Sequence, residues 1–172
     1  MVRYIIFITL VCISMLCSAV AFSQEKYSPR NCEFTAVFPG TPIIKDIYVT
    51  GYFHQSATLI RRNSVLRASC SIFNNNSVFD VDDQAIIEWG KNWAQRMGTI
   101  YPEISINKTN LGKVLTIKGT KNIEGNPITY KGIIHHGQYS RMAVLVGAPA
   151  ESYPTSEIIS FLKSVYINGK SL

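Results

Sequence analysis

Hydrophobic and polar residues alternate along much of the chain, and this period of two predicts a β-sheet. In each segment every second side chain would face an apolar core. The segments are 32–38, 43–52, 56–62, 64–73, 104–107, 113–121, 127–136 and 139–147. Tight turns rich in Gly, Pro and Asn separate most of them. The strands are therefore predicted to pair largely antiparallel.

One long segment, residues 81–97, carries apolar residues every three or four positions, which predicts a helix. The apolar stripe is formed by Ile86, Trp89, Trp93 and Met97. Gly98 stands where a helix is expected to end. Acidic residues at its start would cap the helix and favour the positive end of its dipole. These residues are Asp80, Asp82 and Asp83.

A second helix is predicted over residues 154–165, with Thr155 or Ser156 as its N-cap. Its buried stripe would consist of Ile158, Leu162 and Val165. The order of elements is then strands, long helix, strands, helix. This order predicts one α+β domain, a largely antiparallel sheet with a long central helix and a C-terminal helix packed on it.

The first 23 residues have the pattern of a secretory signal peptide. Arg3 precedes the apolar run 4–16, and small residues then allow cleavage after Ser23 or Ala21. The run is too short and too weakly flanked for a transmembrane helix. We therefore expect residues 24–172 to form a single periplasmic or secreted domain without an integral membrane span. A lipid anchor at Cys17 is the alternative, and bulky Met15 and Leu16 count against it.

The charge balance is modest, with 17 Lys and Arg against 11 Asp and Glu. Basic residues are scattered, and no nucleic-acid recognition motif is present, so nucleic acid is not an expected partner. Arg61, Arg62 and Arg67 form one local cluster. A solvated strand face is the simplest interpretation of this cluster, and a weak site for an anionic partner or membrane surface is the other.

The cysteines indicate a disulfide in the exported domain. Cys12 and Cys17 lie in the predicted signal, which leaves Cys32 and Cys70. Both fall on apolar faces of strand-like segments, and an exported chain meets an oxidising environment. A bond between them would stabilise the fold by about 3–4 kcal/mol on the chain-entropy estimate. Two buried free thiols are the alternative.

Several short motifs, in order, resemble the PsbP-like family. They are residues 34–42 (FTAVFPGTP), the helix with its two tryptophans, Leu111-Gly112-Lys113 before Gly119, 142–147, and 160–165. Together they span residues 32–167. The resemblance implies an α/β/α sandwich. The same superfamily also contains small exported bacterial proteins, and the resemblance implies that this chain is one of them. Photosynthetic members bind metals and other subunits, but no residue-level match carries those sites onto this chain.

The histidines are the first candidates for metal chemistry. His135 and His136 are neighbours on a predicted strand, so their side chains should point to opposite faces. One of them could join His54 and a carboxylate in a Zn²⁺ or Cu²⁺ site. Nothing in the sequence brings these residues together, so we expect surface or packing roles, with no metal or cofactor. The aspartates at 80–83 lack the Gly and Glu of a calcium loop.

The aromatic residues leave two interpretations open. Trp89 and Trp93 could pack in the core, or their indoles could line a ligand groove. The strand aromatics are ordinary in a sheet, although some could form an exposed patch for a partner. They are Tyr48, Tyr52, Phe53, Tyr130 and Tyr139.

No catalytic motif is present in the sequence. The leading hypothesis is a non-enzymatic exported accessory protein that binds a partner protein or an envelope component. The alternative is a small-ligand or metal-binding module that uses the groove between sheet and central helix, with His54 or His135 involved. An exported hydrolase with an unrecognised site is a third hypothesis.

Overall fold

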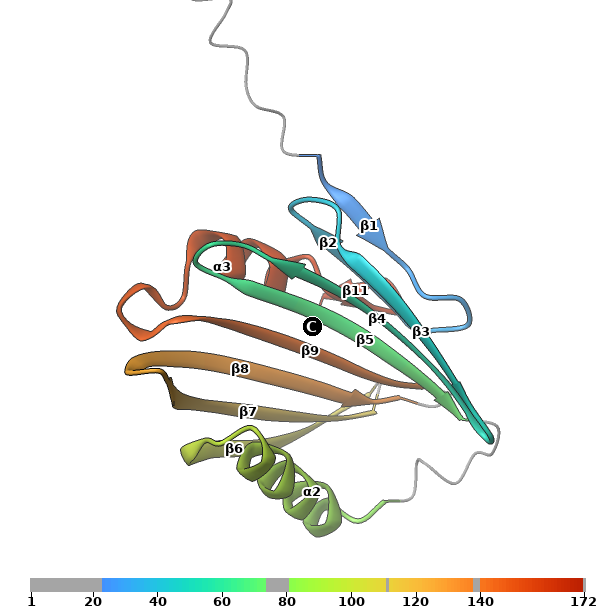
Figure 1. Cartoon of the computed structure of the whole chain (residues 1–172). Coiled ribbons are helices and arrows are strands. Elements are labelled where there is room, and N and C mark those ends of the chain that lie inside the picture. Colours follow the sequence, from blue (N-terminus) through green and yellow to red (C-terminus); the bar gives the residue numbers. More distant parts are fainter. Residues whose placement is uncertain (1–22, 74–80, 111, 138–139, 172) are drawn as a thin grey trace, which may run out of the picture.

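A seven-stranded antiparallel sheet forms the centre of the molecule (Figure 1). The structure, a computed structural model, describes residues 23–73, 81–110, 112–137 and 140–171. Every neighbouring pair of strands in this sheet is antiparallel. In spatial order the strands are β3 (Ile43–Val49), β4 (Tyr52–Ile60), β5 (Val65–Phe73), β9 (Ser140–Pro149), β8 (Asn126–His136), β7 (Gly112–Ile123) and β6 (Ile100–Thr109).

A smaller sheet and one helix cover one face of this large sheet. The small sheet has the order β1 (Glu25–Tyr27), β2 (Phe34–Phe38), β10 (Tyr166–Ile167) and β11 (Lys170–Ser171). Helix α3 (Ser156–Lys163) follows the short 3-10 turn η2 (Ala150–Ser152). Phe34, Phe38 and Phe161 from this cover pack against Leu66, Ala68 and Val144 of the large sheet. This first core lies over β4, β5 and β9.

Helix α2 (Asp83–Arg96) covers the opposite face, at the other end of the sheet (Figure 1). Its Ile86 and Ala94 pack against Leu115 and Ile117 of β7 and against Tyr130 of β8. The two covers thus lie on opposite faces and over different strands. Each half of the large sheet consequently has one covered face and one face that no described helix or strand covers.

The fold agrees with the α+β class and the antiparallel sheet predicted from the sequence, but the helix prediction needs correction. Helix α2 has 14 residues instead of the 17 predicted over 81–97, and it covers β6, β7 and β8 instead of a central position. Asp82 stands at its N-cap without a side-chain capping bond. Asp83 instead makes ion pairs of 2.8 Å with Lys108 and with Lys113. These ion pairs join the first residue of the helix to β6 and β7. Asp80 lies outside the described residues.

The other predicted boundaries are closer. Thr155 caps α3, since its hydroxyl accepts a hydrogen bond from the Ile158 amide at 3.2 Å. Gly98 ends α2 with a φ of 72°, a conformation that glycine adopts without strain. Strands β4 and β6 extend beyond the predicted 56–62 and 104–107, and β1, β10 and β11 are additional.

The predicted signal segment falls almost wholly on residues 1–22, outside the described part of the chain. Within the described residues, no helix has the length and apolar character that crossing a membrane requires.

Candidate functional site

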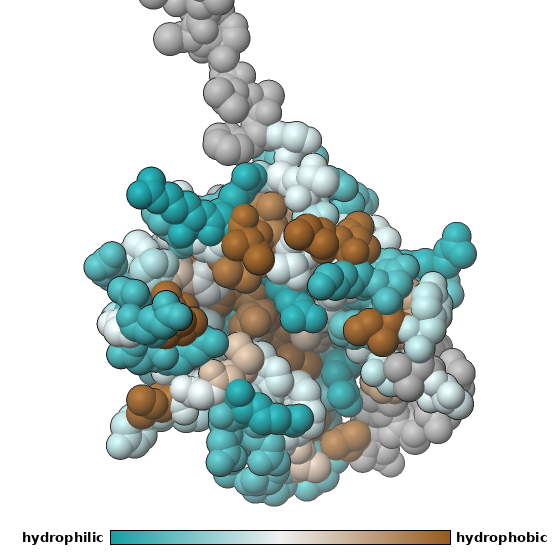
Figure 2. Space-filling model, in the orientation of Figure 1, coloured by the Kyte–Doolittle hydropathy of each residue, from teal (hydrophilic) through white to brown (hydrophobic). Residues whose placement is uncertain are grey.

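A groove of about 250 Å³ lies on the open face of the sheet, beside helix α2. Figure 2 shows this face, with hydrophobic side chains around and inside a central hollow and hydrophilic ones between them. The lining comes from four elements. It consists of His54 on β4, Arg67, Ser69 and Ser71 on β5, Arg141, Ala143 and Leu145 on β9, and Trp89 and Trp93 on α2.

The alternation of β5 explains why polar groups gather here. Leu66, Ala68 and Cys70 face the first core, so Arg67, Ser69 and Ser71 must face the groove. The antiparallel register places His54 and Arg141 on either side of Ser71, and Ala143 opposite Ser69. Three strands thus present one small polar surface below the indoles of α2.

Arg141 is the most constrained cation of the groove. Its guanidinium carbon lies 5.3 Å from the centre of the Phe73 ring and 5.6 Å from that of Trp89. Both distances fit cation–π contacts. Burial lowers the pKa of Arg141 from its ordinary value, and its Nε has no hydrogen-bond acceptor among the described residues. Because the Nε is closed to solvent, an anion in the groove would bind this partly desolvated guanidinium through its other nitrogens.

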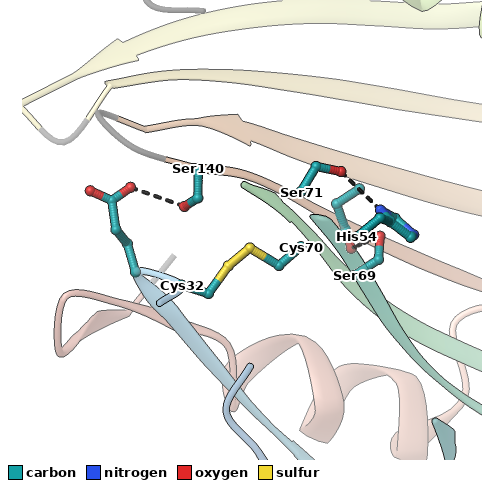
Figure 3. The surroundings of a disulfide bond; sticks show 8 residues. Cys32, His54, Ser69, Cys70, Ser71 and Ser140 are labelled. Carbon is teal, nitrogen blue, oxygen red and sulfur yellow. Dashed lines mark hydrogen bonds between the residues drawn. A yellow bond between two sulfur atoms is a disulfide. The ribbon is translucent and has the colours of Figure 1, made fainter. Parts of the chain in front are cut away.

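His54 contributes a neutral polar group at the same place. Its Nδ1 lies 2.8 Å from the Ser71 hydroxyl (Figure 3). Burial, and secondarily the charge of Arg67, lower the pKa of His54 from 6.5, so the ring is neutral at pH 7. No acidic residue is among the described groove-lining residues. The groove therefore carries two guanidinium groups without a carboxylate to neutralise them.

The structure does not bring the histidines together into a metal site. His135 pairs with Met142 and His136 with Arg141 in the β8–β9 register, so the neighbours point to opposite faces as predicted. Because His135 faces the first core, it does not line the groove; of the two histidines that the alternative hypothesis names, His54 is the one that does. Among the described residues, no three His, Cys, Asp or Glu side chains form a group that could hold a metal ion.

His136 lies on the α2 side of the sheet and is 6% exposed. Burial lowers its pKa to about 4, and the charges of Arg141, His135 and Lys113 add to this effect. His136 is therefore a neutral buried group at pH 7, outside the groove lining.

The two tryptophans combine both roles considered from the sequence. Each packs against the hydrophobic core between α2 and strands β7 and β8, and each lines the groove. Trp93 also contacts Tyr130 edge to face, with ring centres 6.0 Å apart. Tyr130 is buried, whereas Tyr48 is 78% exposed and contacts Phe53. Tyr139 lies outside the described residues.

The arginine cluster divides between different environments. Arg67 enters the groove lining. Arg61 pairs with Glu157 at 3.6 Å and donates to the Pro39 carbonyl at 2.8 Å, which ties the β4–β5 turn to α3. Arg62 is exposed. Only Arg67 therefore belongs to the polar groove, a role that its strand position alone did not indicate.

The disulfide predicted from the sequence is present and joins Cys32 to Cys70, whose Cα atoms lie 6.5 Å apart. Cys70 faces the first core while its neighbours Ser69 and Ser71 face the groove (Figure 3). Near the bond, the Ser140 hydroxyl donates to the Glu33 carboxylate at 3.2 Å. The disulfide thus holds the segment before β2 against the large sheet, on the face opposite the groove.

Comparison with known proteins supports the PsbP-like fold. No family model matches the chain, and no curated protein matches it in sequence. The solution structure of cyanobacterial PsbP (CyanoP) from Synechocystis sp. PCC 6803 is similar, with a TM-score of 0.56 and 12% identity. That match covers 88% of this chain and 95% of CyanoP. LpqN, involved in cell envelope biogenesis of Mycobacterium tuberculosis, matches with a TM-score of 0.47 and 10% identity over 84% of this chain and 91% of LpqN.

The CyanoP likeness establishes that this chain has a PsbP-like fold, as the sequence motifs suggested. At 12% identity it carries no residue of a binding site onto this chain. Function has to be argued from the groove.

Proposed function

We propose that this protein is an exported, non-enzymatic binding protein that holds an anionic ligand in the groove beside α2. The observation that carries the proposal is Arg141, a half-buried guanidinium that lines the groove, contacts two aromatic rings and forms no ion pair with any described residue. Arg67 adds a second positive charge, and no described lining residue is acidic. Such a site favours a carboxylate or phosphate group, which guanidinium binds through charge-assisted hydrogen bonds.

The pair of His54 and Ser71 invites comparison with a hydrolase, and its chemistry argues against one. In a catalytic triad a carboxylate orients the imidazole and stabilises its protonated form. Here Arg67 acts in the opposite direction, because its charge lowers the pKa of His54. The described lining residues include no carboxylate to take the third role. The pair is better suited to presenting a hydroxyl and an imidazole as neutral hydrogen-bonding groups to a bound ligand.

The tryptophan fluorescence of the protein tests the proposal directly. The chain has only two tryptophans, and both line the groove. We expect benzoate and phenyl phosphate to change this fluorescence saturably, and the neutral analogue benzyl alcohol to bind at least tenfold more weakly. Arg141→Gln should abolish the response to both anions, and Arg67→Gln should weaken it.

The matched control is Arg30→Gln, which removes one exposed positive charge outside the groove. Its titration should equal that of the unmodified protein. Equal binding of benzoate and benzyl alcohol, or full binding by Arg141→Gln, would rule out an anion site at this position.

The edge strand β3 favours a second candidate function, the binding of a partner protein that adds a strand to the sheet. Its Ile43, Ile44 and Ile47 are 62%, 51% and 48% exposed. Lys45 and Asp46 stand at its centre. In a two-fold antiparallel pairing of two copies centred there, like charges would meet, which disfavours self-association.

Substitution of one edge residue tests this second candidate. Ile44→Lys should reduce recovery of a specific partner from an envelope extract, compared with the unmodified protein and with Ser105→Lys on the opposite edge strand. Recovery of the same proteins by all three would refute strand addition at β3.

A further inference from the structure

A second, largely apolar pocket of about 300 Å³ lies on the same face of the sheet as the groove. Val65 on β5, Met97 after α2, Tyr130 on β8 and Gly147 on β9 are among the residues that line this second pocket. Leu145 lines both pockets. The apolar pocket therefore begins where the polar groove ends, on the same face of the sheet.

Strand β5 and the segment of helix α2 run along both pockets. On β5 the polar groove takes Arg67, Ser69 and Ser71, and the apolar pocket takes Val65, the next position on that face. On α2 the indoles of Trp89 and Trp93 are followed one turn later by Met97. The span from Ser71 to Val65 is six residues of extended strand, or about 20 Å.

We propose that the groove binds a single-chain anionic amphiphile, with its acidic headgroup between Arg141 and Arg67 and its hydrocarbon chain along Leu145, Val65 and Met97. This inference rests on the proposed function and names the class of ligand for the same site. The two pockets provide the two chemistries that such a molecule needs, side by side and in line. The apolar pocket packs against the methylene chain, and the arginines bind the charged headgroup.

The opposite orientation, with the headgroup at the far mouth, is less favourable. Arg61, Arg62 and Lys121 line that mouth. Arg61 is already engaged by Glu157 and the Pro39 carbonyl, and Arg62 is exposed, as is Arg67, so the two ends differ chiefly in Arg141. Arg141 lines the groove, is partly desolvated and forms no ion pair among the described residues, so an anion gains most there.

Gly147 offers a way to close the apolar pocket without disturbing the polar groove. It lies opposite Val65 and lines only the apolar pocket. A Cβ added at Gly147 would meet its nearest neighbour at 3.6 Å, which is ordinary contact, and the backbone there does not require glycine. Gly147→Val should therefore fold normally and fill the floor of the apolar pocket.

The test is a titration of the two tryptophans with hexanoate, octanoate, decanoate and dodecanoate, each below its critical micelle concentration. Affinity should rise about fourfold per added methylene until the chain fills the pocket, the gain expected for burying one methylene. Decanol, which has the chain without the charge, should bind at least tenfold more weakly than decanoate. Arg141→Gln should remove that preference.

Gly147→Val should flatten the dependence on chain length and leave benzoate binding unchanged. Ser105→Val, on the exposed surface of β6, is the matched control for added bulk and should behave as the unmodified protein. Thermal unfolding of both variants checks that they are folded.

The outcomes separate the two proposals. If benzoate binds but affinity does not rise with chain length, the amphiphile inference is wrong and the anion site stands. If no carboxylate binds, both are wrong. If decanol equals decanoate, the apolar pocket binds ligands without the arginines, and the proposed headgroup site is refuted.

Discussion

The two open half-faces of the large sheet differ in chemistry, although both are made of antiparallel strands beyond the edge of a cover. The open side of β6, β7 and β8 carries groups that pair with one another. Lys118 lies 3.7 Å from the Glu103 carboxylate, and the hydroxyls of Thr120 and Thr129 are 3.2 Å apart. This is the ordinary composition of a solvated strand surface.

The open side of β3, β4 and β5 has a different composition. Ile43 and Ile60 are 62% and 68% exposed there. Arg67 takes part in no ion pair among the described residues. Ile100 is 62% exposed on the other half-face too, so the difference between the half-faces lies in the groove, where two guanidinium groups and two indoles meet without a carboxylate among the described lining residues. The groove is therefore the part of this half-face to which the proposed binding is assigned.

The largest expected effect separates the covered from the open side of a single strand. Leu66 is fully buried in the first core, while its neighbour Val65 is 38% exposed and lines the apolar pocket on the opposite face. Leu66→Ala should lower the free energy of unfolding by about 2–5 kcal/mol, and Val65→Ala by less than about 1 kcal/mol. Urea unfolding of the two variants measures this contrast. Similar losses in both would mean that the groove side of β5 is part of a core.

The covered side also contains the disulfide, which gives the next prediction. Replacing both partners, Cys32→Ala with Cys70→Ala, should cost about 3–4 kcal/mol of stability, because the unfolded chain regains the entropy of a long loop. Ligand binding should survive in the folded fraction, since the bond lies on the face opposite the groove. The control is reductant, which should destabilise the unmodified protein and leave the double variant unchanged. Loss of binding by a folded double variant would show that the two faces are coupled.

The sequence predicted those strands that have one face packed against a cover. On β5 apolar and polar residues alternate over 66–71, and on β9 a run of apolar residues lies next to a turn; both strands were found within a residue or two. The first half of β4 was missed, because Tyr52, Phe53, His54 and Gln55 are all half-buried and leave no alternation. Strands β1, β10 and β11 have only two or three residues, too few for a period to be visible.

The groove was only partly predictable. The spacing of Trp89 and Trp93 allowed an indole-lined groove as an alternative to a core stripe, and the structure gives them both roles. Arg67, Ser69 and Ser71 had the pattern of an ordinary solvated strand face. Their place in a binding groove becomes apparent only together with Arg141. The β5–β9 pairing brings Arg141 opposite Ser71 from 70 residues further along the chain. Long-range register of this kind is set by tertiary packing and leaves no local signal.

His136, which is buried on the side of the sheet that α2 covers, should make the stability of the protein depend on pH. The pKa of His136 is lowered from 6.5 to about 4. Between these two pH values the histidine is protonated in the unfolded state and neutral in the folded state. Its contribution is therefore a loss of stability that begins near pH 6.5 as pH falls and reaches about 3 kcal/mol at pH 4. His136→Leu should keep its stability at pH 7 and fall less steeply toward pH 4. Parallel pH profiles of stability for the variant and the unmodified protein would contradict this assignment.

The smallest expected effect compares one cation from each open half-face. Arg67 is a secondary cause of the lowered pKa of His54, after burial. Arg67→Gln should therefore raise the pKa of His54 without restoring 6.5 fully, because burial remains. NMR titration of the His54 ring protons measures this shift, and Lys118→Gln on the other half-face should leave it unchanged.

The lowered pKa of His54 also affects stability. A lowered histidine pKa costs stability only as pH falls below about 6.5, and Arg67→Gln should reduce that cost. An unchanged His54 titration in Arg67→Gln would mean that the guanidinium is directed away from the groove, and the two-arginine anion site would then be reduced to Arg141 alone.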